Sequence, residues 1–197
     1  MTEMKRLISL FFLLAVLALA QEAAAPVTFD PLFWAKAKPD EVQRYFKKLA
    51  GDDSAALRQI VNRTDRFGRT PLHYAAALNP DPKVAETLIE MGAEVNARDL
   101  LKFTPLHYAA AFNENPEVTE LLIEKGAELE ATDLEGRTPL HTAAINQKNP
   151  EVIAVLLKAG ADAKKKDIYG KTPLDYALEN KYLKDGPAIA LLKAAMR

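Results

Sequence analysis

The chain has 197 residues, of which 49% are hydrophobic and 27% are charged, and it contains no cysteine. This composition fits one domain with a substantial core, and it excludes a disulfide framework and bulk disorder. The 26 basic and 27 acidic side chains leave a net charge of −1, which argues against a nucleic-acid-binding protein.

Residues 1–20 have the three parts of a secretory signal peptide. Lys5 and Arg6 form a positive start, the apolar or small run 7–20 follows, and the run ends in an A-x-A cleavage site. We therefore predict cleavage before Gln21, no stable membrane insertion afterwards, and a location in the periplasm or outside the cell. The alternative is an uncleaved anchor, although a membrane-spanning helix needs roughly 17 to 25 residues.

Residues 21–38 are predicted to be a spacer and N-terminal extension. Small residues dominate its first part, and Asp30 followed by Pro31 then predicts a capped helical turn. Trp34, the only tryptophan, is expected to pack against the first structural unit of the domain that follows.

A repeat array fills the rest of the chain. Thr70, Thr104, Thr138 and Thr172 stand 34 residues apart, and they open the phrases TPLHYAA, TPLHYAA, TPLHTAA and TPLDYAL. A fixed period of this size indicates one supersecondary unit stacked on copies of itself. We divide the domain 39–197 into a diverged N-terminal repeat 39–69, full repeats 70–103, 104–137 and 138–171, and a C-terminal capping repeat 172–197.

The second full repeat shows how one unit is expected to fold. Pro105 suits the first turn of a helix that carries a leucine and two alanines on one face. Asn115 and Pro116 supply a cap and first turn for a second helix, and Gly126 suits the left-handed position after it. The polar residues 127–137 then return to the next repeat, which predicts a hairpin-like loop.

The ends of the array depart from this pattern, as capping repeats do. We predict helices over 39–48 and 54–61 in the N-terminal repeat, and a closing helix over 187–195. Asp175 replaces the histidine of the repeated phrase.

Lys102 is a second departure, because glycine occupies its place in the other hairpins. A lysine with a positive φ costs about 1 to 2 kcal/mol. Either this hairpin bends differently, which we expect, or a bound partner compensates the strain.

Helix, turn, helix and hairpin at this period, opened by T-P-L-H-x-A, resembles the ankyrin repeat over residues 39–197. The resemblance implies an all-α solenoid of stacked helix-turn-helix units with hairpin-like loops. It also implies that His73, His107 and His141 make hydrogen bonds between repeats. A shared metal does not fit these histidines, because stacked helices stand about 8 to 10 Å apart and zinc ligands lie about 2 Å from the metal.

In ankyrin proteins the variable positions lie on the hairpin tips and on the exposed face of the inner helices, which together form a concave surface. Tyr74, Tyr108 and Tyr176 are expected to lie on the same face. Apolar, aromatic and basic side chains are typical of interfaces. Alternatively, Leu100, Leu101 and Leu134 fill space between adjacent hairpins. The candidate protein-binding residues are Arg66, Phe67, Arg69, Leu100, Leu101, Phe103, Phe112, Leu134, Arg137, Ile145, Ile168, Tyr169 and Lys171.

The function implied by this resemblance is protein binding without catalysis. The sequence holds no nucleophile elbow, phosphate loop or zinc-protease motif, and we expect no cofactor and no metal. We expect a monomer of the bacterial exported type that binds an unidentified protein. The alternatives are a regulatory subunit, inhibitor or immunity-type protector of a periplasmic enzyme, and a secreted effector that binds host proteins.

Overall fold

The computed structural model describes residues 27–197, so the predicted signal peptide and the start of the spacer lie outside the described residues. This part of the chain contains helices joined by turns and loops, and no strand. The predicted helices at 54–61 and 187–195 have the predicted bounds, and the predicted helix at 39–48 continues to Ala50. The helices are α2 (Pro31–Lys36), α3 (Pro39–Ala50), α4 (Ser54–Val61), α5 (Pro71–Leu78), α6 (Pro82–Glu90), α7 (Pro105–Phe112), α8 (Pro116–Glu124), α9 (Pro139–Asn146), α10 (Pro150–Lys158), α11 (Pro173–Glu179) and α12 (Pro187–Ala195).

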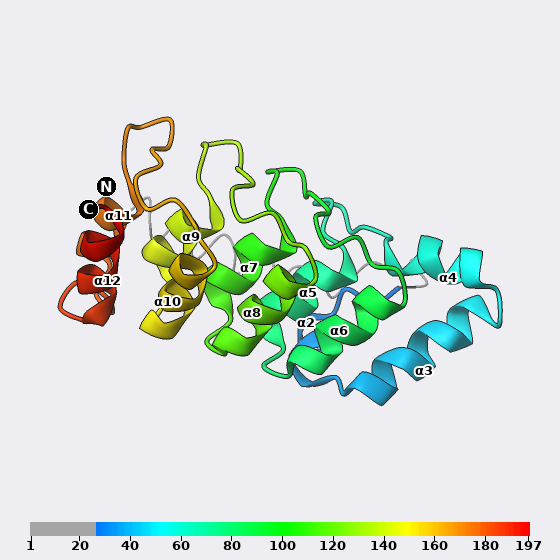
Figure 1. The fold of residues 1–197 in the computed structure, drawn as a ribbon. Coiled ribbons are helices and arrows are strands. Elements are labelled where there is room, and N and C mark those ends of the chain that lie inside the picture. Colours follow the sequence, from blue (N-terminus) through cyan, green and yellow to red (C-terminus); the bar gives the residue numbers. More distant parts are fainter. Residues whose placement is uncertain (1–26) are drawn as a thin grey trace.

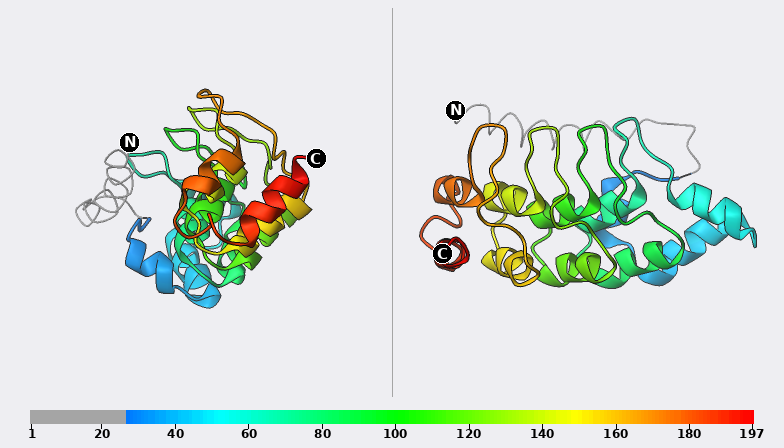
Figure 2. Two further views of the ribbon diagram at one scale, coloured as in Figure 1. Left: turned by 90° about the vertical axis from the view of Figure 1, so that its left-hand side faces the viewer. Right: turned by 45° about the horizontal axis from the view of Figure 1, so that its top comes forward.

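The helices form two layers, and the loops that join successive repeats project from one edge (Figures 1 and 2). The inner helices α5, α7, α9 and α11 stack in order, and the outer helices α6, α8, α10 and α12 stack beside them. Each repeat packs on its neighbours in the chain, which is the architecture of a solenoid. The predicted all-α solenoid is therefore confirmed.

Helix starts follow from the local sequence. The inner helices α5, α7, α9 and α11 begin after a threonine that forms a capping box with the residue three positions on. In the outer layer, the Asn115 side chain accepts a hydrogen bond from the backbone N–H of Glu117 at 3.1 Å. A proline then occupies the first turn, where the missing N–H has no helical partner.

Small side chains let the inner helices approach one another. Ala76, Ala110 and Ala144 occupy equivalent positions and are completely buried. Leu178 takes this position in the last repeat, and 48% of it is exposed. This half-exposed leucine distinguishes α11 from the inner helices that precede it.

The N-terminal extension closes the other end of the solenoid. The Asp30 side chain accepts a hydrogen bond from the backbone N–H of Leu32 at 3.0 Å, which confirms the predicted capped turn as α2. Trp34 in this helix is completely buried, and its ring lies 6.5 Å from that of Phe46 in α3. The expected packing of the tryptophan against the first repeat is confirmed.

The helix pair of the N-terminal repeat differs from the predicted one. We predict that 39–48 and 54–61 form that pair, but α2 packs on inner helix α5, and α3 packs on outer helix α6. The helix α4 packs on α3 and is an addition before the first hairpin. The prediction is wrong because helix signals at 39 and 54 specify where helices begin, and not which neighbours they contact.

A ladder of buried amides joins the ends of the inner helices. The Asn113 side chain donates to the carbonyl oxygens of Ala76 at 3.0 Å and of Asn79 at 2.7 Å. Asn79, Gln147 and Asn180 bond the preceding unit in the same way. Helix ends leave carbonyl groups without intrahelical partners, and the next repeat satisfies them here.

No helix within residues 27–197 is long and apolar enough to cross a membrane.

Candidate functional site

Each hairpin is built around a buried aspartate: Asp65, Asp99, Asp133 or Asp167. One carboxylate oxygen of Asp133 accepts hydrogen bonds from the backbone N–H groups of Glu135 at 2.8 Å and Arg137 at 2.9 Å. The other three aspartates bind the two equivalent N–H groups of their own hairpins. The side chain thus holds the turn from within, as in other Asx turns.

In three of the four hairpins, the second oxygen of the aspartate anchors the hairpin to the inner helix, whereas that of Asp133 accepts from Arg137 of its own hairpin. The hydroxyl groups of Tyr74 and Tyr108 donate to Asp65 and Asp99 at 2.8 Å, and Tyr176 donates to the equivalent aspartate. All three tyrosines are buried, and burial raises the pKa of each. The expectation that they belong to the exposed face is therefore wrong, because their rings support the hairpins.

Successive hairpins are also joined to each other. The backbone N–H of Leu100 donates to the carbonyl of Phe67 at 2.9 Å, and that of Leu134 donates to Leu101 at 3.1 Å. Ile168 continues the series with the carbonyl of the third hairpin. The hairpin tips therefore form a connected row. The aspartates fix each hairpin internally, and the backbone hydrogen bonds join each hairpin to the next.

Lys102 adopts the backbone conformation of the glycines that it replaces. Its φ is 64°, against 79° at Gly68 and 73° at Gly136. Its N–H donates to the carbonyl of Asp99 at 2.9 Å, just as Gly68 donates to Asp65. The expected different bend is wrong, because the aspartate contacts keep the turn in one shape, and the lysine accepts a strain of about 1 to 2 kcal/mol.

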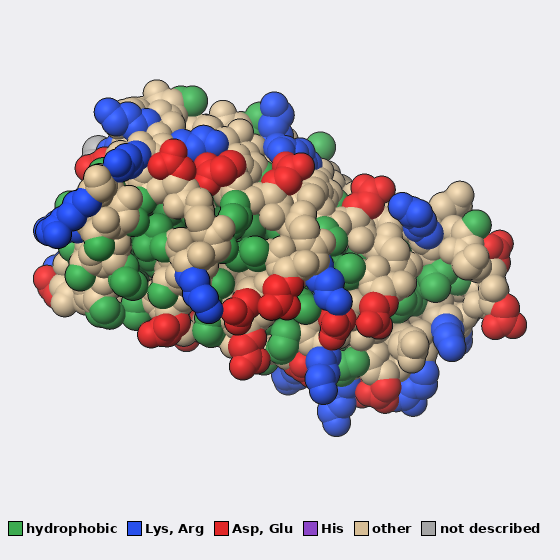
Figure 3. All heavy atoms as spheres, in the orientation of Figure 1, with side chains coloured by type: hydrophobic (Ala, Val, Ile, Leu, Met, Phe, Trp, Pro, Cys, Tyr) green, Lys and Arg blue, Asp and Glu red, His purple; other side chains and the backbone are tan. Residues whose placement is uncertain are grey.

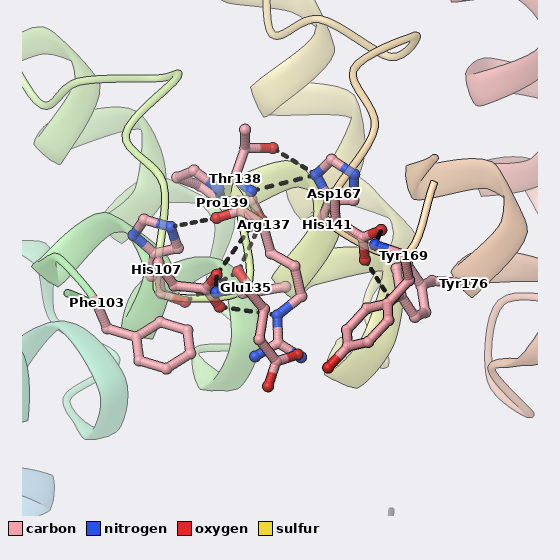
Figure 4. Close-up of polar contacts among 12 residues, drawn as sticks. Phe103, His107, Glu135, Arg137, Thr138, Pro139, His141, Asp167, Tyr169 and Tyr176 are labelled. Carbon is pink, nitrogen blue, oxygen red and sulfur yellow. Dashed lines mark hydrogen bonds and ion pairs between the residues drawn. The ribbon is translucent and has the colours of Figure 1, made fainter. Parts of the chain in front are cut away.

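The histidines bind one repeat to the next (Figure 4). The Nδ1 of His107 accepts from the backbone N–H of Thr104 at 3.1 Å, so Nε2 carries the proton and donates to the carbonyl of Arg137. His73 and His141 make the same two contacts. The predicted hydrogen bonds between repeats are confirmed, and no metal-binding cluster of side chains exists within residues 27–197.

Burial makes these histidines hard to protonate. Desolvation lowers the pKa of His73 and of His107 to about 4, and lowers that of His141 as well. The imidazoles therefore stay neutral at neutral pH, which is the state that their hydrogen bonds require.

Large apolar side chains stand at the outer ends of the hairpins, and we call them the tip row. Between 54% and 69% of each side chain is exposed. Figure 3 shows hydrophobic and basic side chains at the upper edge of the molecule, where the hairpins end. Filling space between hairpins does not account for side chains that are more than half exposed. The tip row consists of Leu100, Leu101, Leu134, Ile168 and Tyr169.

Arg69 does not belong to the accessible surface. Its guanidinium lies 2.7 Å from the Asp65 carboxylate, and only 4% of the residue is exposed. The same group covers the rings of Phe67 and Tyr74 at 4.7 and 4.9 Å. Its assignment as a binding residue is corrected: Arg69 is a buried support of the first hairpin.

Equivalent positions in the later hairpins are partly buried supports as well. The ring of Phe103 lies 5.4 Å from that of His107 and 6.0 Å from that of Tyr108. Arg137 pairs with Asp133 and Glu135 at 2.8 Å (Figure 4). Lys171 lies 5.0 Å from the Tyr176 ring and pairs with Glu179 at 2.9 Å.

The remaining candidates surround the tip row. Arg66 is exposed and lies 4.9 Å from the partly buried ring of Phe67. Phe112 and Ile145 lie on the inner helices α7 and α9, where Phe112 is exposed and Ile145 is partly buried. Of the four aromatic candidates, Phe67 and Phe103 are partly buried, and Phe112 and Tyr169 are exposed, Tyr169 to the greater degree.

The family model for ankyrin repeats (3 copies) matches residues 37–133 and 106–192. The two matches cover more than half of the chain, and the chain therefore belongs to the ankyrin repeat family. A comparison with curated proteins finds no match. Ankyrin repeats are generally protein–protein interaction modules, and the family is typically non-catalytic.

Proposed function

We propose that this protein is a non-catalytic binding protein that docks a partner protein on its tip row and on the adjoining Phe112 and Ile145. The observation that carries the proposal is the set of five large apolar side chains displayed on connected hairpins. Burial of apolar surface supplies about 25 cal/mol per Å², so these side chains are suitable anchors for a partner.

Rigidity supports the same proposal. Backbone contacts of the aspartate hold every hairpin, and a tyrosine or Arg137 bonds its second oxygen, so the hairpins are ordered without a partner. Ordering flexible loops on binding lowers affinity, and a surface that is already ordered avoids that loss.

Affinity capture with paired variants tests this function. Leu100→Ser with Ile168→Ser removes two tip-row anchors, and Leu32→Ser with Leu178→Ser is a matched control elsewhere on the surface. Leu100 and Leu32 are 69% and 70% exposed, so both changes should leave the melting temperature nearly unchanged. We expect the first pair to weaken capture of the partner at least tenfold, about 1.4 kcal/mol. Equal capture by both pairs would contradict the proposal.

We also propose that the protein is exported, on the basis of the signal-peptide pattern in residues 1–20. N-terminal sequencing of the protein from its native cells should find Gln21 as the first residue. Intact Met1 on membrane-bound protein would instead support an anchor.

The cellular source of the partner separates the specific roles. Capture of an enzyme from periplasmic extract, with a change in that enzyme's activity, supports the regulator, inhibitor or protector. Capture from host lysate alone supports the secreted effector.

A further inference from the structure

One recurring backbone contact joins the hairpins. The residue directly after the turn aspartate donates its N–H to a carbonyl group of the preceding hairpin, and this acceptor stands two residues after the aspartate of its own hairpin. The three hydrogen bonds are Leu100 to Phe67 at 2.9 Å, Leu134 to Leu101 at 3.1 Å, and Ile168 to Glu135 at 3.1 Å. The contact therefore has the same form and the same direction along the solenoid each time.

The series stops at the fourth hairpin, which is the last in the row of hairpins (Figure 2). Tyr169 holds the acceptor position in this hairpin, and no group within residues 27–197 donates to its carbonyl oxygen. No fifth hairpin lies beside it in the part of the chain that the structure describes. The fourth hairpin thus presents the acceptor that each earlier hairpin uses to bind the next one.

The side of the fourth hairpin that faces away from the third is uncovered. A Cβ atom at Gly68 would lie 3.0 Å from the Leu100 nitrogen in the second hairpin, and one at Gly136 would lie 3.4 Å from the Ile168 nitrogen in the fourth. At the equivalent Gly170, no other part of residues 27–197 comes within 4 Å of such a Cβ atom. The space that the next hairpin fills elsewhere is therefore open here.

Large apolar side chains flank this open acceptor. Ile168 is 66% exposed and Tyr169 is 63% exposed. At the other end of the row, the N–H of Arg66 also lacks a partner within residues 27–197, but its own side chain is charged and the neighbouring Phe67 is partly buried. Of the two open ends, the fourth hairpin is therefore the one that suits an apolar segment.

We propose that a loop of the partner protein docks beside the fourth hairpin as a fifth member of the row. A backbone N–H of this loop donates to the Tyr169 carbonyl. The residue that carries the N–H is a leucine or isoleucine, as in the three contacts within the chain, and its side chain covers Ile168 and Tyr169. Main-chain hydrogen bonds to an open edge give affinity, and the side chains beside them give specificity. This inference rests on the proposed function, because it uses the same row.

Selection of short random peptides displayed on phage, with the intact protein as the target, supplies the probe. We expect the selected peptides to share a leucine or isoleucine. Ile168→Ser should weaken their binding at least tenfold, about 1.4 kcal/mol, and Leu100→Ser should leave it unchanged. The two changes are matched, because Leu100 and Ile168 hold equivalent positions and are 69% and 66% exposed. Equal effects of the two changes, a greater effect of Leu100→Ser, or a selection that yields no peptide would overturn the inference.

Isotope labelling tests the hydrogen bond itself. Tyr169 is the only tyrosine followed by glycine, so 13C in the tyrosine carbonyls and 15N in the glycines together isolate the signal of its peptide group. A selected peptide should shift this carbonyl signal to higher frequency, because a hydrogen bond to the oxygen deshields the carbon. An unchanged signal at saturation would contradict the proposed contact.

A second form of the selected peptide is the matched control. An ester in place of the amide at its leucine or isoleucine removes the N–H donor and keeps the side chain. We expect this ester to bind the protein at least tenfold more weakly than the amide. Equal affinity of the two peptides would show that no backbone N–H pairs with the fourth hairpin.

The two proposals fail in different ways. If Leu100→Ser with Ile168→Ser abolishes capture of the partner, but the partner leaves the Tyr169 carbonyl signal unchanged, the partner uses the tip row without adding a fifth member to it. If that pair of changes leaves capture intact, the proposed function itself is wrong.

Discussion

The Nε2 atom of His107 in α7 lies 3.1 Å from the carbonyl oxygen of Arg137, at the end of the following hairpin. This bond spans 30 residues of sequence and fastens an inner helix to the next repeat. The same relationship joins His73 to Phe103 and His141 to Lys171. Together with the amide ladder at the opposite end of the inner helices, it ties each repeat to its neighbour twice.

Replacement of His107 with alanine should lower the free energy of unfolding by about 1 to 3 kcal/mol, because it leaves buried backbone groups unpaired. Urea denaturation measures the change. Asp175→Ala is the control, since Asp175 bonds Thr172 of its own repeat and no following repeat. We expect a smaller loss there. Bound metal that disappears with His107→Ala, without loss of stability, would contradict the structural role.

Acid should destabilise the protein through the same histidines. His73 and His107 have a pKa near 4 in the folded protein and about 6.5 when unfolded, so the unfolded chain takes up protons first. Their contribution to stability is complete above pH 6.5 and is lost as the pH falls to 4, by about 3 kcal/mol for each histidine. Burial raises the pKa of Asp99, and this carboxyl works in the opposite direction.

Urea midpoints measured from pH 7 to 4 check this dependence. The double variant His73→Gln with His107→Gln should be less stable at pH 7 and should lose less stability on acidification. A natural protein whose midpoint stays constant between pH 6.5 and 4.5 would show that these histidines are not the buried neutral groups described above.

Lys102→Gly should raise the free energy of unfolding by about 1 kcal/mol, because glycine adopts a φ of 64° without the steric penalty. Gly68→Ala and Gly170→Ala test the converse. Both add strain, but only a Cβ at Gly68 would approach the next hairpin, 3.0 Å from the Leu100 nitrogen. Thermal unfolding should give Gly68→Ala a lower melting temperature than Gly170→Ala. A destabilised Lys102→Gly variant would mean that the lysine side chain supports the fold.

Thr119→Val should stabilise the protein by about 1 kcal/mol. The hydroxyl of Thr119 is completely buried in α8 and has no hydrogen-bond partner within residues 27–197, and a buried unpaired polar group is destabilising. The equivalent residue in α10 is the apolar Ile153. Thr142→Val is the matched control, because the Thr142 hydroxyl donates to the Pro139 carbonyl at 2.9 Å. Denaturant titration should show opposite shifts for the two variants.

Truncation of Phe103 and of Tyr169 should distinguish a residue that stabilises the fold from one that binds the partner protein. Phe103→Ala loses edge-to-face contacts with His107 and Tyr108, each worth about 0.5 to 1.5 kcal/mol, and should lower the melting temperature. Tyr169 is mostly exposed, so Tyr169→Ala should leave the melting temperature unchanged and weaken partner capture. If Tyr169→Ala lowered the melting temperature and Phe103→Ala weakened only partner capture, Tyr169 would support the fold and Phe103 would bind the partner.

Helix positions and stacking order could be read from the sequence because their causes are local and repeated. Threonine followed by proline specifies each inner helix start, and Asn115 followed by Pro116 specifies an outer one. The 34-residue spacing then implies that equivalent helices lie side by side. Tip-row exposure was also predictable, because these residues follow the turn aspartates and lie outside the apolar stripes of the helices.

Tertiary contacts decided the rest. Arg69 and Tyr74 look like surface residues in the sequence, yet both are buried because they converge on Asp65 from a hairpin and a helix. The equivalent contacts of Asp99 hold Lys102 in a conformation that favours glycine. The helix α2 is an inner helix only because it packs on α5. A local pattern specifies which dihedral angles a segment prefers, whereas burial and strain depend on groups that other segments bring to the same place.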